Sequence, residues 1–248
     1  MTDGPIKLET QAAYYHVTHW KAGSQWLLAV LKDAFGVAVV QPRELVKHAY
    51  ATAPSGGSVY PCCYLTQPEF CAVPAHPDAR RFVVVRDLRD TLISGYFSLR
   101  YTHNLNGHID KYRWFLNRFS VDDGLIYLMD VWLLQSALIQ RSWLANGERV
   151  FQFENFMRQP AAALHDVLTL GWRLEVSRGA AEQLAARHRF AHYAGGRAPG
   201  QEDTNSHYRK GLPGDWRQHF TPRVKEQFKA LYNDIILASG YEAGADWT

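Results

Sequence analysis

The chain has 248 residues, of which 47% are apolar and 21% charged, a mixture that excludes a mainly disordered, collagen-like or coiled-coil protein and allows one domain with a buried core. The 27 Lys and Arg residues exceed the 24 Asp and Glu residues by only three, which is too few to indicate a nucleic-acid-binding protein. We therefore expect an ordinary folded domain without a nucleic-acid partner.

No segment of the sequence is typical of a transmembrane helix. The longest uncharged run, residues 49–68, contains Pro54 and Pro61 together with two glycines, which a membrane-spanning helix would not tolerate. The first ten residues lack the basic start and apolar core of a secretory signal, so a cytoplasmic protein is expected. The three cysteines match no zinc-site spacing and are expected to be reduced thiols: Cys62, Cys63 and Cys71.

The first predicted elements are a strand and a helix joined by a tight loop. Residues 13–18 (AYYHVT) are β-branched and aromatic, which favours a strand, and residues 26–35 have the apolar pattern of a helix. A second strand is predicted at 81–85 (RFVVV), after which Asp87 can cap a helix to about Tyr101. A continuous apolar strand is typical of a parallel sheet that is covered on both faces.

The same alternation continues through the second half of the chain. Residues 125–144 are apolar around much of the helical circumference and predict a largely buried helix, and residues 149–153 (RVFQF) predict the next strand. Without an internal repeat or a long linker, the fold class is α/β, with one domain over residues 1–248 and a central parallel sheet. The polar, Gly- and Pro-containing stretch from 195 is too irregular for a simple connection and predicts a lid loop at 195–214, before helix resumes from Asp215 with Pro222 in a first turn.

The segment THWKAGSQW, residues 18–26, is the strongest candidate for a functional site. Gly23 allows the backbone to approach a ligand closely, the following amides begin a helix, and Lys21 and Ser24 supply a charge and a hydroxyl. These features favour a phosphate-type anion site over an ordinary strand-to-helix turn. The segment is not a Walker A loop, because its lysine precedes the glycine.

Two further segments place cations where an anion could bind. Arg86 leaves the buried strand in VVVRDLRDTLIS, and Ser94 lies two helical turns later. An arginine at that position needs an anionic partner, either a ligand or Asp87 or Asp90. In YRKGLPGDWRQHFT, Arg209 and Lys210 stand at the end of the polar loop, where two cations could close over a ligand phosphate.

Taken in order, the three segments resemble motifs of the cytosolic sulfotransferase family, which uses 3′-phosphoadenosine 5′-phosphosulfate (PAPS) as its sulfuryl donor. THWKAGSQW is similar to the family's TYPKSGTTW loop, RDLRDTLIS to its 3′-phosphate segment, and RKGLPGDWRQHFT to its RKGxxGDWKxxFT motif. The resemblance implies a fold like that of P-loop nucleotide kinases. It also implies sulfuryl transfer to a hydroxyl or amine of a small molecule, with adenosine 3′,5′-diphosphate (PAP) as the product and no metal.

The resemblance also implies a role for each matching residue. Lys21 would stabilise charge on the departing phosphate, Trp26 would stack on adenine, and two groups of residues would bind the ends of the donor. The 5′ group would be held by Lys21, Ala22, Gly23, Ser24 and Gln25, and the 3′-phosphate by Arg86, Ser94, Arg209, Lys210 and Gly211.

The sequence departs from the family at two positions that bear on chemistry. Gln25 replaces the family's second threonine, and the position of the family's basic histidine is occupied by Tyr64. A phenol has an ordinary pKa of about 10, far above neutrality, so another group can be the base. Among 11 histidines, His103 is the main candidate, with His108 and His19 as others.

Other interpretations remain open at this point. A nucleotide kinase would share the fold but would need a glycine-rich ATP loop and magnesium ligands, and a catalytically silent nucleotide-binding protein would fit the missing histidine. The acceptor is expected to be apolar or aromatic, because 13% of the residues are aromatic and several fall near the expected pocket: Tyr96, Phe97, Tyr101, Trp114 and Phe115.

Overall fold

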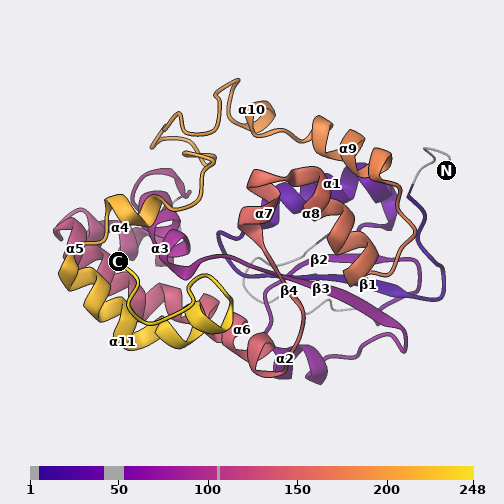
Figure 1. Ribbon diagram of the computed structural model, residues 1–248, viewed down its shortest axis with the longest axis horizontal. Helices are drawn as coiled ribbons and strands as arrows, with labels where there is room; N and C mark the ends of the chain where they lie inside the picture. Colours follow the sequence, from indigo (N-terminus) through magenta and orange to yellow (C-terminus); the bar gives the residue numbers. More distant parts are fainter. Residues whose placement is uncertain (1–5, 42–52, 105–106) are drawn as a thin grey trace. The chain divides into compact units, whose positions relative to one another are not determined.

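The structure is a computed structural model that describes residues 6–41, 53–104 and 107–248. The chain divides into two compact units, one of residues 1–85 and 138–189 and the other of residues 86–137 and 190–248. The first contains the β-sheet and is called the sheet unit here; the second, the helical unit, is made of helices and loops (Figure 1). The THWKAGSQW segment therefore belongs to the sheet unit, and RDLRDTLIS and RKGLPGDW belong to the helical unit.

Four parallel strands form the sheet, in the order β2-β1-β3-β4. The two central strands pair in register from Ala13 opposite Ala79 to Val17 opposite Val83. All residues of β1 and the last four of β3 are buried, which fits a sheet that is covered on both faces, and the predicted α/β class is confirmed. The strands are β1 (Ala13–Val17), β2 (Val59–Cys63), β3 (Ala79–Val85) and β4 (Val150–Gln152).

Helices cover both faces of this sheet because successive strand residues point to opposite sides. Tyr14 and Phe82 belong to the core beneath α1 and α8, and Tyr15 and Val83 belong to a second core that includes Trp143 of α6. Figure 1 shows α1, α7 and α8 on one face and α2 on the other. The helical elements with residues in this unit are α1 (Ser24–Phe35), η1 (Gly36–Ala38), α2 (Gln67–Ala72), the end of α6 (Leu134–Ala145), α7 (Phe153–Arg158), α8 (Pro160–Asp166), η4 (Val167–Gly171) and α9 (Arg178–Arg187).

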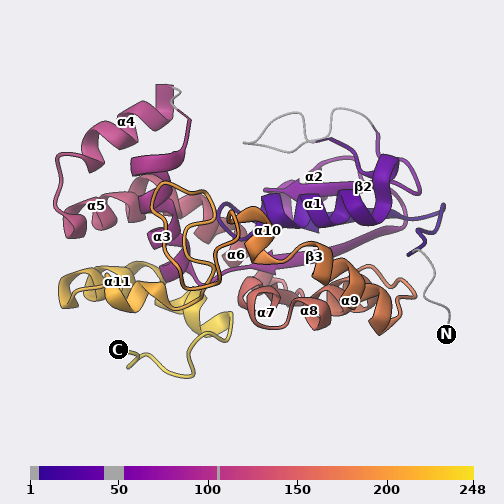
Figure 2. The same cartoon turned by 90° about the horizontal axis from the view of Figure 1, so that it is seen from above.

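The helical unit groups α3, α4, α5 and α11 (Figure 2). Tyr232 of α11 donates from its hydroxyl to the Met129 carbonyl, which joins that helix to the segment after α5. Two of the helices continue as π-helical segments, η2 and η3. The elements are α3 (Leu88–Phe97), η2 (Ser98–Thr102), α4 (Gly107–Leu116), α5 (Val121–Leu128), η3 (Met129–Leu133), the start of α6, α10 (Phe190–Tyr193), the 3₁₀ helix η5 (Asp215–Gln218) and α11 (Pro222–Ala238).

Most of the predicted elements are confirmed. The strands expected at 13–18, 81–85 and 149–153 are β1, β3 and β4, and the helix expected at 125–144 is the continuous run of α5, η3 and α6. Asp87 caps α3 as predicted, since its carboxylate accepts from the Arg89 amide at 2.9 Å. The residues alone did not predict β2, which lies within the uncharged run 49–68; positions 49–52 of that run are outside the described residues.

None of the helices in the described ranges combines the length and the apolar character needed to cross a bilayer. All three cysteines are free, as expected: Cys62 and Cys63 are buried and Cys71 is exposed.

Candidate active site

The loop between β1 and α1 is a tight turn with two residues in the left-handed region. Lys21 has a φ of 65° and Gly23 a φ of 74°, a conformation that glycine adopts freely and a lysine rarely. A Cβ atom at Gly23 would lie 2.0 Å from Cε2 of Phe153, so a larger residue would strain the backbone and require the Phe153 ring to shift. The turn therefore begins α1 directly after the carboxyl end of β1.

The N-terminus of α1 suits an anion. The N-cap residue Gly23 makes no side-chain capping bond, and no acidic side chain lies in the first turn. The positive end of the helix dipole and the first amides are the groups that bind phosphate and sulfate at helix N-termini. Lys21 adds a full positive charge two residues before the N-cap.

The residues that follow Gly23 differ in their surroundings. Ser24 is buried, and its Oγ accepts a hydrogen bond of 2.7 Å from the Tyr64 hydroxyl. Gln25 is exposed, whereas Trp26 is half-buried and donates from Nε1 to the His188 carbonyl at 2.8 Å. The expected stacking of Trp26 on adenine stays a prediction.

Tyr64 has surroundings that disfavour a role as a base. Burial raises the pKa of its phenol, so the phenolate is disfavoured, and the hydroxyl is the donor in the bond to Ser24. A general base must accept a proton near neutral pH. The role of Tyr64 as the base stays a prediction, and these surroundings do not favour it.

In the helical unit, Arg86 immediately follows β3 and Ser94 lies half-buried on α3. The two carboxylates that could pair with Arg86 are engaged by other groups. Asp87 accepts from Arg89 at 2.8 Å, and Asp90 accepts from the amides of Gly214 and Trp216. The contact of Arg86 with a ligand phosphate stays a prediction.

Asp90 joins the two motifs of the helical unit. Its carboxylate oxygens accept from Gly214 N at 2.6 Å and from Trp216 N at 3.0 Å, which fixes the start of η5 against α3. The guanidinium of Arg89 lies 4.0 Å from the Trp216 ring centroid and 4.5 Å from that of Trp247. Segments that are more than 100 residues apart in sequence therefore form one structure, as their resemblance to a single family site predicts.

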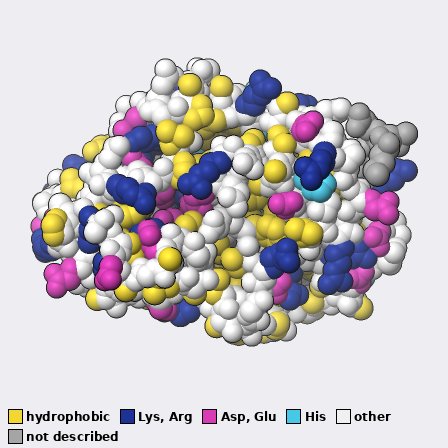
Figure 3. Space-filling model, viewed as in Figure 1, with side chains coloured by type: hydrophobic (Ala, Val, Ile, Leu, Met, Phe, Trp, Pro, Cys, Tyr) yellow, Lys and Arg dark blue, Asp and Glu magenta, His cyan; other side chains and the backbone are white. Residues whose placement is uncertain are grey.

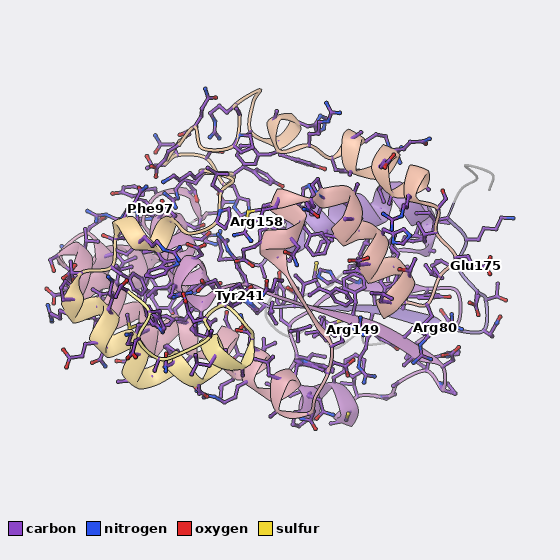
Figure 4. All side chains as sticks on the ribbon, in the orientation of Figure 1. Arg80, Phe97, Arg149, Arg158, Glu175 and Tyr241 are labelled. Atoms are coloured by element: carbon purple, nitrogen blue, oxygen red, sulfur yellow. The ribbon has the colours of Figure 1, made fainter. Side chains whose placement is uncertain are left out.

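Arg209 and Lys210 are already paired with carboxylates. Both form ion pairs with Asp215, and Arg209 also pairs with Glu202. The Arg209 guanidinium lies 4.3 Å from the ring centroid of Phe97, the last residue of α3, which is labelled in Figure 4. The two cations are thus held in place by acids of the same unit.

The loop before these cations has its own hydrogen bonds. Gly200 N donates to the Lys210 carbonyl at 2.7 Å, and Asp203 N donates to the Arg209 carbonyl at 2.9 Å. The guanidinium of Arg197 also donates to the carbonyls of Arg209 and Tyr208. The loop at 195–214 is therefore folded back on itself; its action as a lid stays a prediction.

Replacing Asp215 by asparagine should lower the free energy of unfolding by about 2 kcal/mol at pH 7, because Arg209 and Lys210 lose an ionised partner. Burial alone would raise the pKa of Asp215, but hydrogen bonds from His219, Arg209 and Lys210 hold it well below its usual range. The stability from this carboxylate is therefore present above its unfolded-state pKa of about 3.9 and is lost as the pH falls further.

Urea unfolding of the parent and of Asp215→Asn at pH 7, 4 and 3 checks this prediction. The gap between the two proteins should narrow as the pH falls below about 4. Asp166→Asn, at an exposed position of α8, is the control and should show little change. A gap of constant size over this range would contradict the assigned role of Asp215.

The three histidines predicted as candidates for the base differ in burial and in their neighbours. Nδ1 of His19 donates to the Trp20 carbonyl at 2.9 Å and its Nε2 lies 2.7 Å from Nε2 of Gln140, so both ring nitrogens of this buried side chain have partners. His108 is exposed on α4. His103 is half-buried after η2, and its ring centroid is 6.5 Å from that of His207 in the 195–214 loop.

Comparison with known proteins identifies the family. The sequence model described as "Sulfotransferase domain" matches residues 73–240, which is more than half of the chain and includes both motifs of the helical unit. The chain belongs to the sulfotransferase family. The matched range does not include the THWKAGSQW loop at 18–26, so the assignment of that loop rests on its own residues and its resemblance. As a family member, the protein is an enzyme that transfers a sulfuryl group.

Solved structures share the fold of this sulfotransferase. Mouse sulfotransferase SULT7A1 complexed with PAP is 17% identical, with a TM-score of 0.62 over 93% of this chain and 86% of that one. Retinol dehydratase with androsterone and PAP is 13% identical, with a TM-score of 0.53 over 92% and 81% of the two chains. Retinol dehydratase with retinol and PAP is 14% identical, with a TM-score of 0.53 over 93% and 82%. A sequence search of curated proteins gave no match.

The surface and the acidic side chains of this sulfotransferase bear on the other interpretations. On the face seen in Figure 3, Lys and Arg side chains are interspersed with Asp and Glu and do not form one basic patch. Within residues 6–41, 53–104 and 107–248, no group of three His, Cys, Asp or Glu side chains could hold a metal ion.

Proposed function

We propose that this sulfotransferase takes its sulfuryl group from PAPS and transfers it to a hydroxyl or amine of a small-molecule acceptor. The observation that carries the proposal is the pair of hydrogen bonds that the Asp90 carboxylate accepts from the amides of Gly214 and Trp216. These bonds join the RDLRDTLIS and RKGLPGDW segments, which both contain cations, into one structure. The similar structures that contain PAP support the choice of nucleotide. We further propose a cytoplasmic location, which the resemblance to cytosolic sulfotransferases supports.

The chain's residues fit such a donor. The turn at Gly23 and the N-terminus of α1 suit the 5′ group, and Arg209 beside Phe97 of α3, with its neighbour Lys210, suits the 3′-phosphate. In this assignment Trp26 contacts adenine. The residues assigned to the 5′ group are Lys21, Ala22, Gly23, Ser24 and Gln25, and those assigned to the 3′-phosphate are Arg86, Ser94, Arg209, Lys210 and Gly211.

The donor supplies a sulfuryl group that is already activated by its bond to phosphate. In the transfer, the sulfur–oxygen bond to that phosphate breaks as a bond to the acceptor oxygen or nitrogen forms. Lys21 balances the negative charge on the phosphate oxygen that leaves, and the acceptor's proton passes to a base. Because the transferred group needs little covalent help, positioning and charge stabilisation supply most of the rate.

We assign the base to His103. It follows η2 on the chain that continues α3, and it is half-buried, whereas His108 is exposed and His19 is fully buried. His103→Ala should flatten the acid limb of the pH profile and should slow transfer to an alcohol by a larger factor than transfer to an acidic phenol, which needs less help. Steady-state rates with both acceptors check this, and equal slowing of the two would show that His103 has only a structural role.

We propose an apolar or aromatic acceptor, which would contact aromatic residues after Arg86. Tyr101 and Trp114 are 45% and 53% exposed, unlike the buried Tyr96, and exposed aromatic rings are typical of binding surfaces. The androsterone and retinol in two of the similar structures support this class.

A screen with PAPS and mixtures of phenols, alcohols, amines and sugars tests the proposed function. Release of PAP that depends on one acceptor mixture is the expected result. PAP binding without release of product from any mixture would instead favour a nucleotide-binding protein that is catalytically silent, and magnesium-dependent ATP turnover would favour a kinase.

A further inference from the structure

Tyr64 occupies the position where the resemblance expects a histidine base, yet its hydroxyl is directed at the anion loop. It follows β2 directly and is only 5% exposed, and it donates to Ser24 Oγ at 2.7 Å. Ser24 is the first residue of α1. The bond therefore connects the end of one strand to the helix N-terminus that follows the neighbouring strand.

The direction of this bond matters for the chemistry of Ser24. A hydroxyl has one hydrogen to donate and two lone pairs that accept. Because the Tyr64 hydrogen is placed on the Ser24 oxygen, the hydrogen of Ser24 must point elsewhere and is available to a second oxygen. Burial raises the pKa of Tyr64, so the phenol keeps the hydrogen that it donates to Ser24.

A second contact fastens the same two segments. The thiol of Cys62 donates to the Ser24 carbonyl at 3.4 Å, and Cys62 has a φ of 58°, which a residue with a side chain rarely adopts. Tyr64 itself is held by the ring of Trp20, whose centroid lies 6.4 Å away in an edge-to-face arrangement. The end of β2 thus supports both the side chain and the backbone of Ser24.

We infer that Tyr64 is a positioning residue whose hydroxyl orients Ser24 so that the Ser24 hydroxyl donates to the anionic 5′ group of the donor. This inference rests on the proposed function, because it takes the 18–26 loop as the site of that group. Tyr64 does not touch the reacting atoms in this role and acts only through Ser24.

A double-mutant cycle on PAP binding, measured by calorimetry, tests the inference. Ser24→Ala should weaken PAP binding by about 10-fold, the effect of one hydrogen bond to a charged group. Tyr64→Phe, which keeps the ring, should weaken it by a smaller factor in the parent and should have no further effect in the Ser24→Ala background. The pH profile of turnover should keep its shape in Tyr64→Phe.

Tyr60→Phe is the matched control. Tyr60 is also a buried tyrosine of β2, but its hydroxyl accepts from the Ser55 amide at 2.8 Å. Its substitution should leave PAP binding within about two-fold of the parent while showing what the loss of a buried tyrosine hydroxyl does to stability.

The outcomes separate the inference from the proposed function. Parent protein that fails to bind PAP would overturn the proposed function itself. Parent protein that binds PAP, with effects of Tyr64→Phe and Ser24→Ala that multiply, would overturn only the inference. A Tyr64→Phe chain that does not fold would also overturn the inference, because the hydroxyl would then support the whole fold. Loss of the acid limb of the pH profile in Tyr64→Phe would overturn it too, because Tyr64 would then act as a base.

Discussion

Lys21→Ala should lower turnover by about 100-fold or more while donor binding falls by much less. A preorganised charge that meets developing negative charge contributes on this scale to the transition state and less to the ground state. The position of Lys21 supports this role, since it stands in a left-handed turn directly before the N-terminus of α1, where no acidic side chain lies in the first turn. Steady-state turnover and calorimetric PAP binding measure the two quantities.

Lys32→Ala is the control for the loss of a lysine from the same segment. Lys32 is exposed in the last turn of α1, far along the helix from the loop. Its substitution should leave turnover close to that of the parent. Turnover of Lys21→Ala within a few-fold of the parent would remove Lys21 from the chemistry.

PAP should bind at least about 100-fold more tightly than adenosine 5′-phosphate. A hydrogen bond to a charged group contributes about 1.5 to 3 kcal/mol, so two contacts to the 3′-phosphate are enough for this ratio. Arg86→Ala should erase much of the difference, whereas Arg118→Ala, at an exposed position over the Trp114 ring, should not. Calorimetry with both nucleotides at one salt concentration gives the ratio.

Ordering of the 195–214 loop provides a second measurement of the same contact. Because Arg209 and Lys210 end the polar part of that loop, PAP should slow protease cleavage there and adenosine 5′-phosphate should not. Equal affinity for the two nucleotides would contradict the assignment of the 3′-phosphate site to Arg86, Ser94, Arg209 and Lys210.

The sequence predicted the strands whose residues are apolar on both faces. The runs that became β1 and β3 are the central strands, so their burial is visible in residue type alone. Residues 59–63, which form β2, read VYPCC and combine a proline with small cysteines at the edge of the sheet, where neither propensity nor alternation predicts a strand. Only pairing with β1 reveals that strand.

The site was predictable where function depends on residue order, and not where it depends on tertiary contacts. The loop glycine and the cations stand in recognisable motifs. The key hydrogen bonds join positions that are 40 or more residues apart: Asp90 to Gly214 and Trp216, and Tyr64 to Ser24. Nothing in the spacing of Asp90 distinguishes it from the neighbouring N-cap residue Asp87, so its role appears only in the folded chain.

Arg209 and Lys210 already form ion pairs with carboxylates. An anionic ligand that binds these cations must therefore displace a carboxylate. Asp215 and Glu202 belong to the same chain and so compete at a high effective concentration. A monovalent anion such as chloride has too little charge and too few hydrogen-bond acceptors to displace them, whereas a phosphate monoester has about two negative charges and three acceptor oxygens. If these cations receive the 3′-phosphate, they select ligands by charge state before shape, and the selection weakens below about pH 6, where the monoester dianion takes up one proton and becomes a monoanion.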